Sequence, residues 1–435
     1  MKNLVLILLA ILMVSVSVLS QTITRLSDMP ERVTNQAVAF AEVDGEGFVY
    51  SFAGLDSTKL FSGIHQKGFK YDVANDTWQE IDPLPSGNGR IAAGASLVKD
   101  KIYIIGGYEV FEDDSEISVD LVHVYDPATD TYLPDASPIP LAIDDHVQAV
   151  WRDSLIYVVT GWSNTTNVPN VQIYNPAEDE WTAGTPVPDN NTYKVFGSSG
   201  VIVGDTIYYA GGVRIVGGSF GFSNVLRKGV IDAQNPTNIT WTHQLAFNAI
   251  GYRMGAATWD GEIPLWIGGS EAAYNYDGIA YNTGLGVNPY ERILQLDPAS
   301  NNLRETATSL PIMDNREVAQ LDEKSIIICG GMSTGQQVSN TTYLLDVNFV
   351  NVVEQGMARE QNYFVYPTPS SELIFIDNGT IGLRYEIVSM RGLITKSGVY
   401  QKSGIPIGSL AAGLYFVNMM DIQGGIIPCG RFVKH

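Results

Sequence analysis

A hydrophobic strand that ends in a pair of glycines, or in a close variant of that pair, recurs six times along the chain. Successive copies are 53, 54, 51, 57 and 62 residues apart. Self-similarity at a period of this length is typical of a protein built from repeated supersecondary units. The strands are FVYSFAG, IYIIGG, IYVVTG, IYYAGG, LWIGG and IIICGG, and they end at Gly54, Gly107, Gly161, Gly212, Gly269 and Gly331.

A second strand with Tyr-Asp or a similar pair follows most of these glycines, as in GFKYD, VHVYDP, VQIYNP and ILQLDP. An aromatic residue then opens a further strand, namely Trp78, Tyr132, Trp181 or Trp241. Each unit therefore holds about four short strands with turns between them. That content predicts β-propeller blades and not a helical solenoid.

The glycine pairs, the Tyr-Asp strands and the Trp residues together resemble the kelch repeat over residues 22–351. The fourth repeat departs from the pattern, with VIDAQNP in place of Tyr-Asp, and the sixth lacks a Trp after Asp346. The resemblance implies an all-β fold with a six-bladed kelch-type β-propeller.

The outer strand of the sixth repeat has a candidate at the other end of the chain. Residues 22–32 read TITRLSDMPER and align with residues 303–316, the outer strand and exit of the fifth repeat. We expect this N-terminal strand to close the propeller, which removes exposed sheet edges. The alternative uses residues 346–353 as the outer strand and leaves the N-terminal piece unused.

Residues 1–20 read MKNLVLILLAILMVSVSVLS, in which one Lys precedes an apolar run and then small residues. This order predicts a secretory signal peptide cleaved before Gln21. The alternative is an uncleaved membrane anchor, although the apolar run is short for a span. We therefore expect export without stable membrane insertion.

After a linker at residues 352–362, alternating apolar strands and Gly-containing turns over residues 363–435 predict a small β-sandwich. The ordered motifs YPTP, YEI with RG, LAAGLYF and a terminal KH resemble the type A C-terminal sorting domain of the type IX secretion system. Thr368 stands where that pattern has Asn. The resemblance implies a Bacteroidetes-type bacterium, type IX machinery as a partner, and a secreted or outer-surface location reached through the periplasm. The alternative is an adhesive immunoglobulin-like sandwich.

The chain carries 47 acidic residues against 26 Lys and Arg, a formal net charge of −21. Nucleic acid and anionic membrane surfaces would repel such a surface, so neither is an expected partner.

Strand counting places the loops before each first strand and the loops after each glycine pair on one side of the disc, which we call the Gly-Gly face. Basic residues before the strands and aromatic residues after the glycines suit an acidic or glycan ligand. Comparable arginines bind acidic ligands in other kelch domains, so the resemblance supports this face. The alternative is that the arginines join blades and the aromatics cap the core. The candidate ligand-binding residues are Arg90, Arg253, Arg316, Lys194, His146, Trp162 and Tyr276.

No metal or cofactor is predicted. The five histidines are scattered, with no pair at the spacing of metal ligands. Neither Cys329 nor Cys429 lies in a sequence that matches the copper site of a propeller-type oxidase. The acidic run at residues 112–120 matches no calcium loop, and a solvated loop is favoured. No catalytic set is recognisable, although Asp144, Asp145, Glu271 and Glu317 could act as acids or bases.

These features favour a non-catalytic binding module for a glycan or protein ligand, and the chain is more readily a binding protein than an enzyme. The alternative is a carbohydrate-active enzyme similar to the sialic acid mutarotases, which needs only an arginine clamp and one acid–base group. A surface scaffold is a third possibility, because a propeller fold does not fix a function.

Overall fold

The computed structural model describes residues 14–354, 364–377, 381–389, 393–420 and 426–435. The first thirteen residues of the predicted signal peptide and most of the predicted linker lie outside these ranges. The chain separates into two compact units, and the larger comprises Val18–Val350.

The larger unit consists of four-stranded antiparallel sheets, six in the described part of the chain. Five of them follow the chain order, so each is an up-and-down meander from one repeat. The sheets are β2-β3-β4-β5 (Ala37–Val43, Glu46–Leu55, Ile64–Asp72, Thr77–Ile81), β6-β7-β10-β11 (Gly94–Val98, Lys101–Ile105, Val122–Asp126, Thr131–Tyr132), β12-β13-β16-β17 (Val147–Trp151, Leu155–Val159, Val171–Asn175, Glu180–Ala183), β18-β19-β22-β23 (Ser199–Val203, Thr206–Ala210, Val225–Asp232, Asn235–Leu245), β24-β25-β26-β27 (Gly255–Trp259, Ile263–Ile267, Arg292–Asp297, Asn302–Ala307) and β28-β29-β32-β1 (Ala319–Gln320, Ser325–Cys329, Thr342–Glu354, Val14–Leu26).

The sixth sheet is the exception to chain order, because its outer strand β1 comes from the N-terminal end. Strand β32, which includes residues 346–353, lies between β29 and β1 as the third strand. The alternative assignment of residues 346–353 to the outer position is therefore wrong.

Short elements lie in the loops of the larger unit, five between the second and third strands of a sheet and one 3-10 turn between the fourth and fifth sheets. Four are two-stranded hairpins and two are 3-10 turns that lie near sheet ends. They are β8-β9 (Tyr108–Val110, Glu116–Ser118), β14-β15 (Trp162–Ser163, Thr166–Asn167), β20-β21 (Val213–Val216, Ser219–Phe222), β30-β31 (Met332–Ser333, Gln337–Val338), η1 (Phe61–Gly63) and η2 (Phe247–Ala249).

The repeated Tyr and Asp form one recurrent contact. The hydroxyl groups of Tyr71, Tyr125 and Tyr174 donate to an aspartate five residues later, at 2.6, 3.0 and 2.7 Å. Each of these aspartates has a positive φ in the turn that follows the third strand. The contact satisfies a buried phenol and fixes the turn, so the partner of the repeated Tyr is this second aspartate and not the residue directly after it in the Tyr-Asp pair.

The repeated Trp joins its own sheet to another segment. The indole N–H groups of Trp78, Trp181 and Trp241 donate to the carbonyls of Ser27, Ser137 and Thr185 at 3.1, 2.8 and 3.0 Å. Each acceptor lies in the chain that precedes the Trp's own repeat or follows the previous sheet. The aromatic ring and its polar edge therefore both serve packing between repeats.

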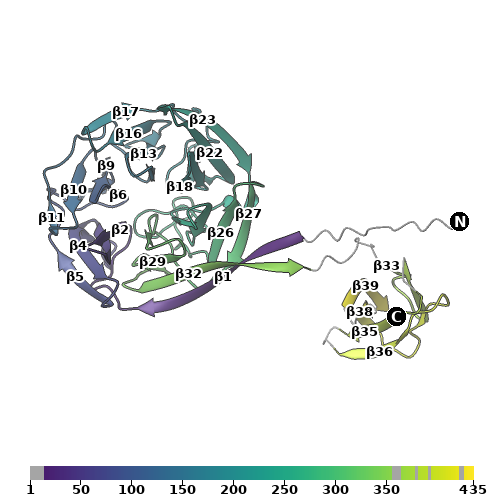
Figure 1. Ribbon diagram of the computed structural model, residues 1–435. Coiled ribbons are helices and arrows are strands. Elements are labelled where there is room, and N and C mark those ends of the chain that lie inside the picture. Colours follow the sequence, from purple (N-terminus) through teal and green to yellow (C-terminus); the bar gives the residue numbers. More distant parts are fainter. Residues whose placement is uncertain (1–13, 355–363, 378–380, 390–392, 421–425) are drawn as a thin grey trace. The chain divides into compact units, whose positions relative to one another are not determined.

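The core is divided among the interfaces between sheets (Figure 1), which stand in a ring with β2, β6 and β18 toward the middle. Each successive pair of sheets shares one apolar cluster, and the sixth sheet shares one with the first. Burial of a large apolar side chain contributes about 1.5–3 kcal/mol. The fold is therefore stabilised by separate apolar clusters, one between each pair of neighbouring sheets.

The glycine pairs stand where two repeats approach closely. Gly268 has a φ of +63°, and a Cβ there would collide with the carbonyl oxygen of Ile312, in the segment that leads to the sixth sheet. Only glycine satisfies both conditions at this position.

The C-terminal unit holds two antiparallel sheets, β33-β34-β37 (Phe364–Tyr366, Leu373–Asp377, Ile405–Pro406) and β36-β35-β38-β39 (Ile394–Val399, Arg384–Ser389, Gly413–Met420, Ile426–Lys434). Both contribute to one buried cluster, with Ile374 and Ile405 from the first sheet and Tyr385, Val417 and Phe432 from the second. No helix in the described residues has the length and apolar character needed to cross a membrane.

Candidate ligand-binding face

The segment before each first strand pairs with the residue after a glycine pair, and it does so in all six repeats. These isolated bridges are Thr34–Leu55, Ile91–Tyr108, Asp144–Trp162, Phe196–Val213, Tyr252–Ser270 and Met313–Met332. The two sets of loops therefore meet on one side of the larger unit, the Gly-Gly face, as strand counting predicts.

One residue beyond each bridge, the chain reaches a position with positive φ in every repeat. The six equivalent residues are Asn35, Ala92, Asp145, Gly197, Arg253 and Asp314. Backbone bonds link several of them in order, from Asp145 N–H to the Ala92 carbonyl (3.2 Å), from Gly197 N–H to that of Asp145 (2.8 Å) and from Arg253 N–H to that of Gly197 (2.8 Å). We call this set the axial ring.

Arg253 is the centre of a buried ion network in the axial ring, and its side chain is fully inaccessible. Its Nε and Nη2 donate to Asp145 at 3.0 and 2.7 Å, and its Nη1 donates to Asp314 at 2.8 Å. Arg316 Nε lies 3.2 Å from Asp145 Oδ1. The remaining oxygen of Asp314 accepts the hydroxyl of Thr34 at 2.7 Å.

The charges in this network hold one another ionised. Burial alone would raise the pKa of Asp145, but Arg253 and Arg316 hold it below its ordinary value. Burial likewise opposes the charge of Arg253, yet Asp145, Tyr252 and Asp314 raise its pKa well above the usual value. Two arginines thus face two aspartates, and the network contributes no excess positive charge.

The other candidate residues lie in different settings. Arg90 is fully buried, donates to the carbonyl of Ile104 at 3.4 Å, and has its pKa lowered to about 10 by burial. Lys194 pairs with Asp189 at 2.5 Å. His146 is buried beside Gln148 (3.0 Å), and burial followed by the charge of Arg316 lowers its pKa to about 3.

Register explains which candidates meet. Relative to the axial ring, Arg253 is at the ring position itself, Arg316 is two residues after it, and Arg90 is two residues before it. Arg316 therefore turns back to Asp145 and to the carbonyls of His146 and Ala93, at 2.9 and 2.6 Å. The structure brings Arg253, Arg316 and His146 together and places Arg90 and Lys194 elsewhere.

A small cavity of about 80 Å³ opens beside the network on the Gly-Gly face. Five of its eight lining residues are aromatic, and the other three are carboxylates. The ring centres of Trp162 and Phe196 are 5.2 Å apart, and those of Phe220 and Tyr281 are 4.6 Å apart. The lining residues are Tyr108, Trp162, Phe196, Phe220, Tyr281, Glu116, Asp144 and Asp145; we call this cavity the aromatic cage.

Asp144 and Glu116 lie in the aromatic cage without a basic partner in any ion pair of the described residues. Asp144 is 4 % exposed and accepts the hydroxyl of Ser118 at 2.5 Å. Burial and the neighbouring Asp145 raise its pKa well above the ordinary range. Glu116 is exposed overall, but partial removal from water beside the cage also raises its pKa. Unlike Asp145, which is paired with two arginines, these two acids have no ion-paired basic side chain within the described chain to stabilise their negative charge.

Of the predicted aromatics, Trp162 lines the aromatic cage, whereas Tyr276 does not line it. Tyr276 is 9 % exposed and packs in the apolar cluster that also contains Tyr108 and Phe196 of the cage. Tyr108, Phe220 and Tyr281 lie in loops that follow glycine pairs and also line the cage. Phe196 was missed, since it precedes a strand and follows no glycine pair. Asp314 was missed as well, although aligning the repeats on Arg253 would have found it.

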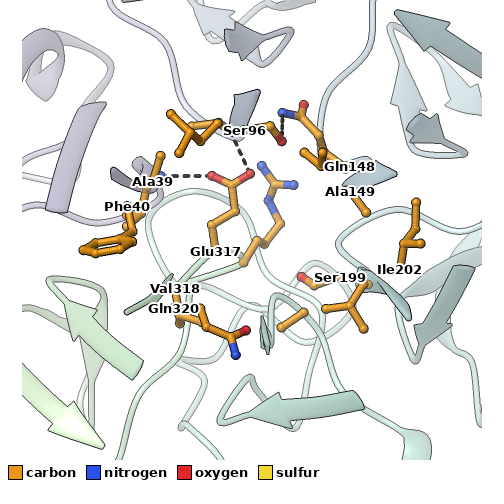
Figure 2. A pocket seen from close by; sticks show the side chains of 18 of the residues that line it. Ala39, Phe40, Ser96, Gln148, Ala149, Ser199, Ile202, Glu317, Val318 and Gln320 are labelled. Atoms are coloured by element: carbon orange, nitrogen blue, oxygen red, sulfur yellow. Dashed lines mark hydrogen bonds between the residues drawn. The ribbon is translucent and has the colours of Figure 1, made fainter. Parts of the chain in front are cut away.

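A second cavity, of about 350 Å³, runs between the innermost strands (Figure 2). Glu317 is its main acid, and its two oxygens accept the backbone N–H groups of Val38 and Ala95 at 2.9 and 2.8 Å. Burial raises the pKa of Glu317 to about 7. Gln148 donates to Ser96 at 2.8 Å. Glu317 and Gln148 therefore have partners, whereas Ser199 Oγ and His146 Nδ1 on the wall of this cavity have no hydrogen-bond partner in the described structure.

In the part of the chain that the structure describes, no three His, Cys, Asp or Glu side chains are placed to hold a metal ion.

A kelch motif model matches residues 89–137, which span the second sheet from Arg90 through β11. Residues 89–137 therefore carry a kelch motif. The chain is 28% identical to the Kelch-like protein terF of Aspergillus terreus over 204 residues, 45% of this chain and 42% of that protein. It is 23% identical to the human Kelch repeat and BTB domain-containing protein 12 over 278 residues, 59% of this chain and 40% of that protein.

The chain thus spans less than half the length of these curated relatives. Among solved structures it is similar to that of YjhT, with a TM-score of 0.59 and 16% identity, over 75% of this chain and 99% of the other. This likeness shows a propeller-like fold. Kelch-repeat proteins generally act as protein-binding modules.

Proposed function

We propose that this kelch chain is a secreted or cell-surface binding module that holds a protein ligand at the Gly-Gly face without chemical conversion. The six sheets then form a closed six-bladed propeller whose last blade takes β1 as its outer strand. The observation that carries the proposal is the aromatic cage, a preformed recess with unpaired carboxylates on a face built by all six repeats.

The size of the aromatic cage favours a protein ligand over a free sugar. Pockets that enclose small molecules measure about 300–1,000 Å³, whereas this cage measures about 80 Å³. A single side chain from a larger partner fits such a recess, and the surrounding loops supply the rest of the contact.

The mutarotase alternative needs arginine N–H groups that are free to hold a sugar carboxylate. Arg253 uses three N–H contacts on Asp145 and Asp314, and Arg316 donates to two carbonyls. Arg90 keeps Nε and Nη1 without a hydrogen-bond partner in the described structure, but its side chain is fully buried, where a ligand does not reach it. Binding a sugar acid there would leave buried aspartates unpaired, at a cost of about 3–5 kcal/mol. A glycan ligand in general stays open as an outcome of the experiment.

We propose further that the chain is exported with a cleaved signal peptide and that residues 363–435 form a sandwich read by the type IX machinery. Strand β1 runs across the proposed cleavage point, and Leu19 is buried in the cluster between the fifth and sixth sheets. Cleavage before Gln21 leaves Gln21–Leu26 for the outer strand, with Ile23 against the same cluster. Mass spectrometry of the exported protein, expected to begin at Gln21, tests this proposal.

The binding function is tested with the full exported chain on a glycan array and a peptide array in parallel. We expect saturable binding to a subset of peptides, weakened by Phe220→Leu and unchanged by Phe247→Leu. Phe247 is the matched control because it is 85 % exposed on η2 and lies outside the cage. Binding confined to sugar acids, with their conversion, would establish the enzyme instead.

A further inference from the structure

The aromatic cage combines the two features that proteins use to recognise an organic cation. Trp162, Phe220 and Tyr281 present ring surfaces, and Glu116 and Asp144 add carboxylates. The faces of aromatic rings carry negative electrostatic potential, so several rings around one recess attract an ammonium group. Nearby carboxylates strengthen the same preference.

The rings stand around the recess and not in a single stack. Trp162 is inclined to Phe196 by 57° and to Phe220 by 56°, and Phe220 is inclined to Tyr281 by 42°. The ring centres of Trp162 and Phe220 are 6.0 Å apart. Tyr281 is 37 % exposed, so this wall of the cage stands at the protein surface.

The local charge balance favours a cation over an anion as the occupant. The arginines next to the cage are neutralised by Asp145 and Asp314, whereas Asp144 and Glu116 remain without basic partners in the described chain. The adjacent loop adds the exposed acids Glu112, Asp113 and Asp114. A formal net charge of −21 directs cations toward the whole molecule.

We propose that the aromatic cage receives the alkylammonium end of a lysine side chain, unmodified or methylated, on the protein ligand. This inference rests on the proposed binding function and names the chemistry of its ligand. The nitrogen lies among the rings with Glu116 and Asp144 as counter-charges, while the aliphatic part of the lysine passes Tyr281 toward the surface.

The state of Asp144 fits this role. Burial disfavours its charge most, followed by Asp145 and Glu116, whereas the Ser118 hydroxyl and Arg253 favour it. A bound ammonium adds a second favourable charge, so Asp144 releases a proton when the cage is filled. Binding is therefore expected to strengthen as pH rises. The other ionisable groups that face Asp144 are Asp145, Glu116 and Arg253. Asp145 and Arg253 form an ion pair with each other, and the pKa of Glu116 is raised.

The experiment titrates the full chain with Nα-acetyl-Nε-trimethyllysine amide and with tetramethylammonium, and follows the ligand by saturation-transfer NMR. Nα-acetylnorleucine amide is the neutral comparison, and N-acetylneuraminate is the anionic one. We expect saturable binding of both cations, weakening with added salt, and none of the neutral or anionic compound.

Paired variants assign the binding to the cage. Phe220→Leu removes a ring and is expected to weaken cation binding about three- to tenfold. Glu116→Gln removes a charge and is expected to weaken it about two- to fivefold. Phe247→Leu on η2 and Glu180→Gln, at an exposed position of the outer strand β17, make the same chemical changes outside the cage and should leave the affinity unchanged.

Absence of saturable cation binding, or equal binding by wild type and Phe220→Leu, would overturn the inference. A preference for N-acetylneuraminate would overturn it too. Failure here is separable from failure of the proposed function. A peptide ligand found on the array that trimethyllysine amide does not displace leaves the binding function intact and removes the cage from it. Cation binding to the cage without any ligand on either array would leave the cage as a cation site and remove the proposed binding function.

Discussion

Asp144 and Asp145 are neighbours in the chain, but the structure gives them opposite surroundings. Asp145 contacts Arg253 and Arg316 in the axial ring, and its pKa lies below the ordinary value. Asp144 faces the aromatic cage without a basic partner in the described structure, and its pKa is raised. The comparison shows that an ionisable group is available to a ligand only when the fold has not already supplied its counter-charge.

The largest expected effect comes from removing the cation of the axial ring. Arg253→Met leaves Asp145 and Asp314 buried with their main partner gone, so the free energy of unfolding should fall by about 3–5 kcal/mol. Urea unfolding followed by Trp fluorescence measures this change. All seven Trp residues lie between positions 78 and 266, so the signal reports on the larger unit. Arg152→Met, at an exposed pair with Asp205, is the control and should cost about 1 kcal/mol or less.

The second effect separates the two aspartates directly. Asp145→Asn should lower the free energy of unfolding by about 2–4 kcal/mol because it breaks a buried charge pair. Asp144→Asn should change it by about 1 kcal/mol or less, since the side chain has no basic partner to lose. Equal losses in the two variants, measured by the same unfolding experiment, would refute the contrast between network and cage.

The third effect concerns the cavity of about 350 Å³, where the Glu317 carboxyl group accepts backbone N–H groups from β2 and β6. Its folded pKa of about 7 exceeds the usual glutamate value, so its contribution is fully present below about pH 4.5 and is lost as pH rises through about 7. The free energy of unfolding should therefore decline by roughly 1–3 kcal/mol across that window. Glu317→Gln should remove this part of the pH dependence, and a profile with an unchanged slope would contradict the assignment.

The smallest expected effect is on the stability of a variant of the cage itself. Glu116 is an exposed residue without an ion pair in the described chain. Glu116→Gln should therefore change the free energy of unfolding by about 0.5 kcal/mol or less, while it weakens cation binding as described above. A large loss of stability would show that Glu116 supports the fold and would remove it from the ligand site.

Much of the architecture could be predicted from the sequence because each repeat encodes its own sheet. Tyr125 and Asp130 are 5 residues apart in the chain, and Trp181 and Ser137 are 44 residues apart, in neighbouring repeats. Both kinds of contact recur with the motif. The convergence of the two loop sets on the Gly-Gly face followed from strand counting alone. Arg90 shows where this reasoning failed, because a basic residue before a strand can lie two positions away from the axial ring.

The sequence by itself determined the repeat, its strands, the glycines at close approaches and the aromatic loops of one face, because these depend on contacts within a repeat or between neighbouring repeats. Only the tertiary structure decided which charges cancel. Arg253 meets Asp145 across 108 residues, and a shift of one residue in any repeat would point the side chain elsewhere. The strength of such a pair also depends on its removal from water, and that burial exists only when all the repeats have packed together.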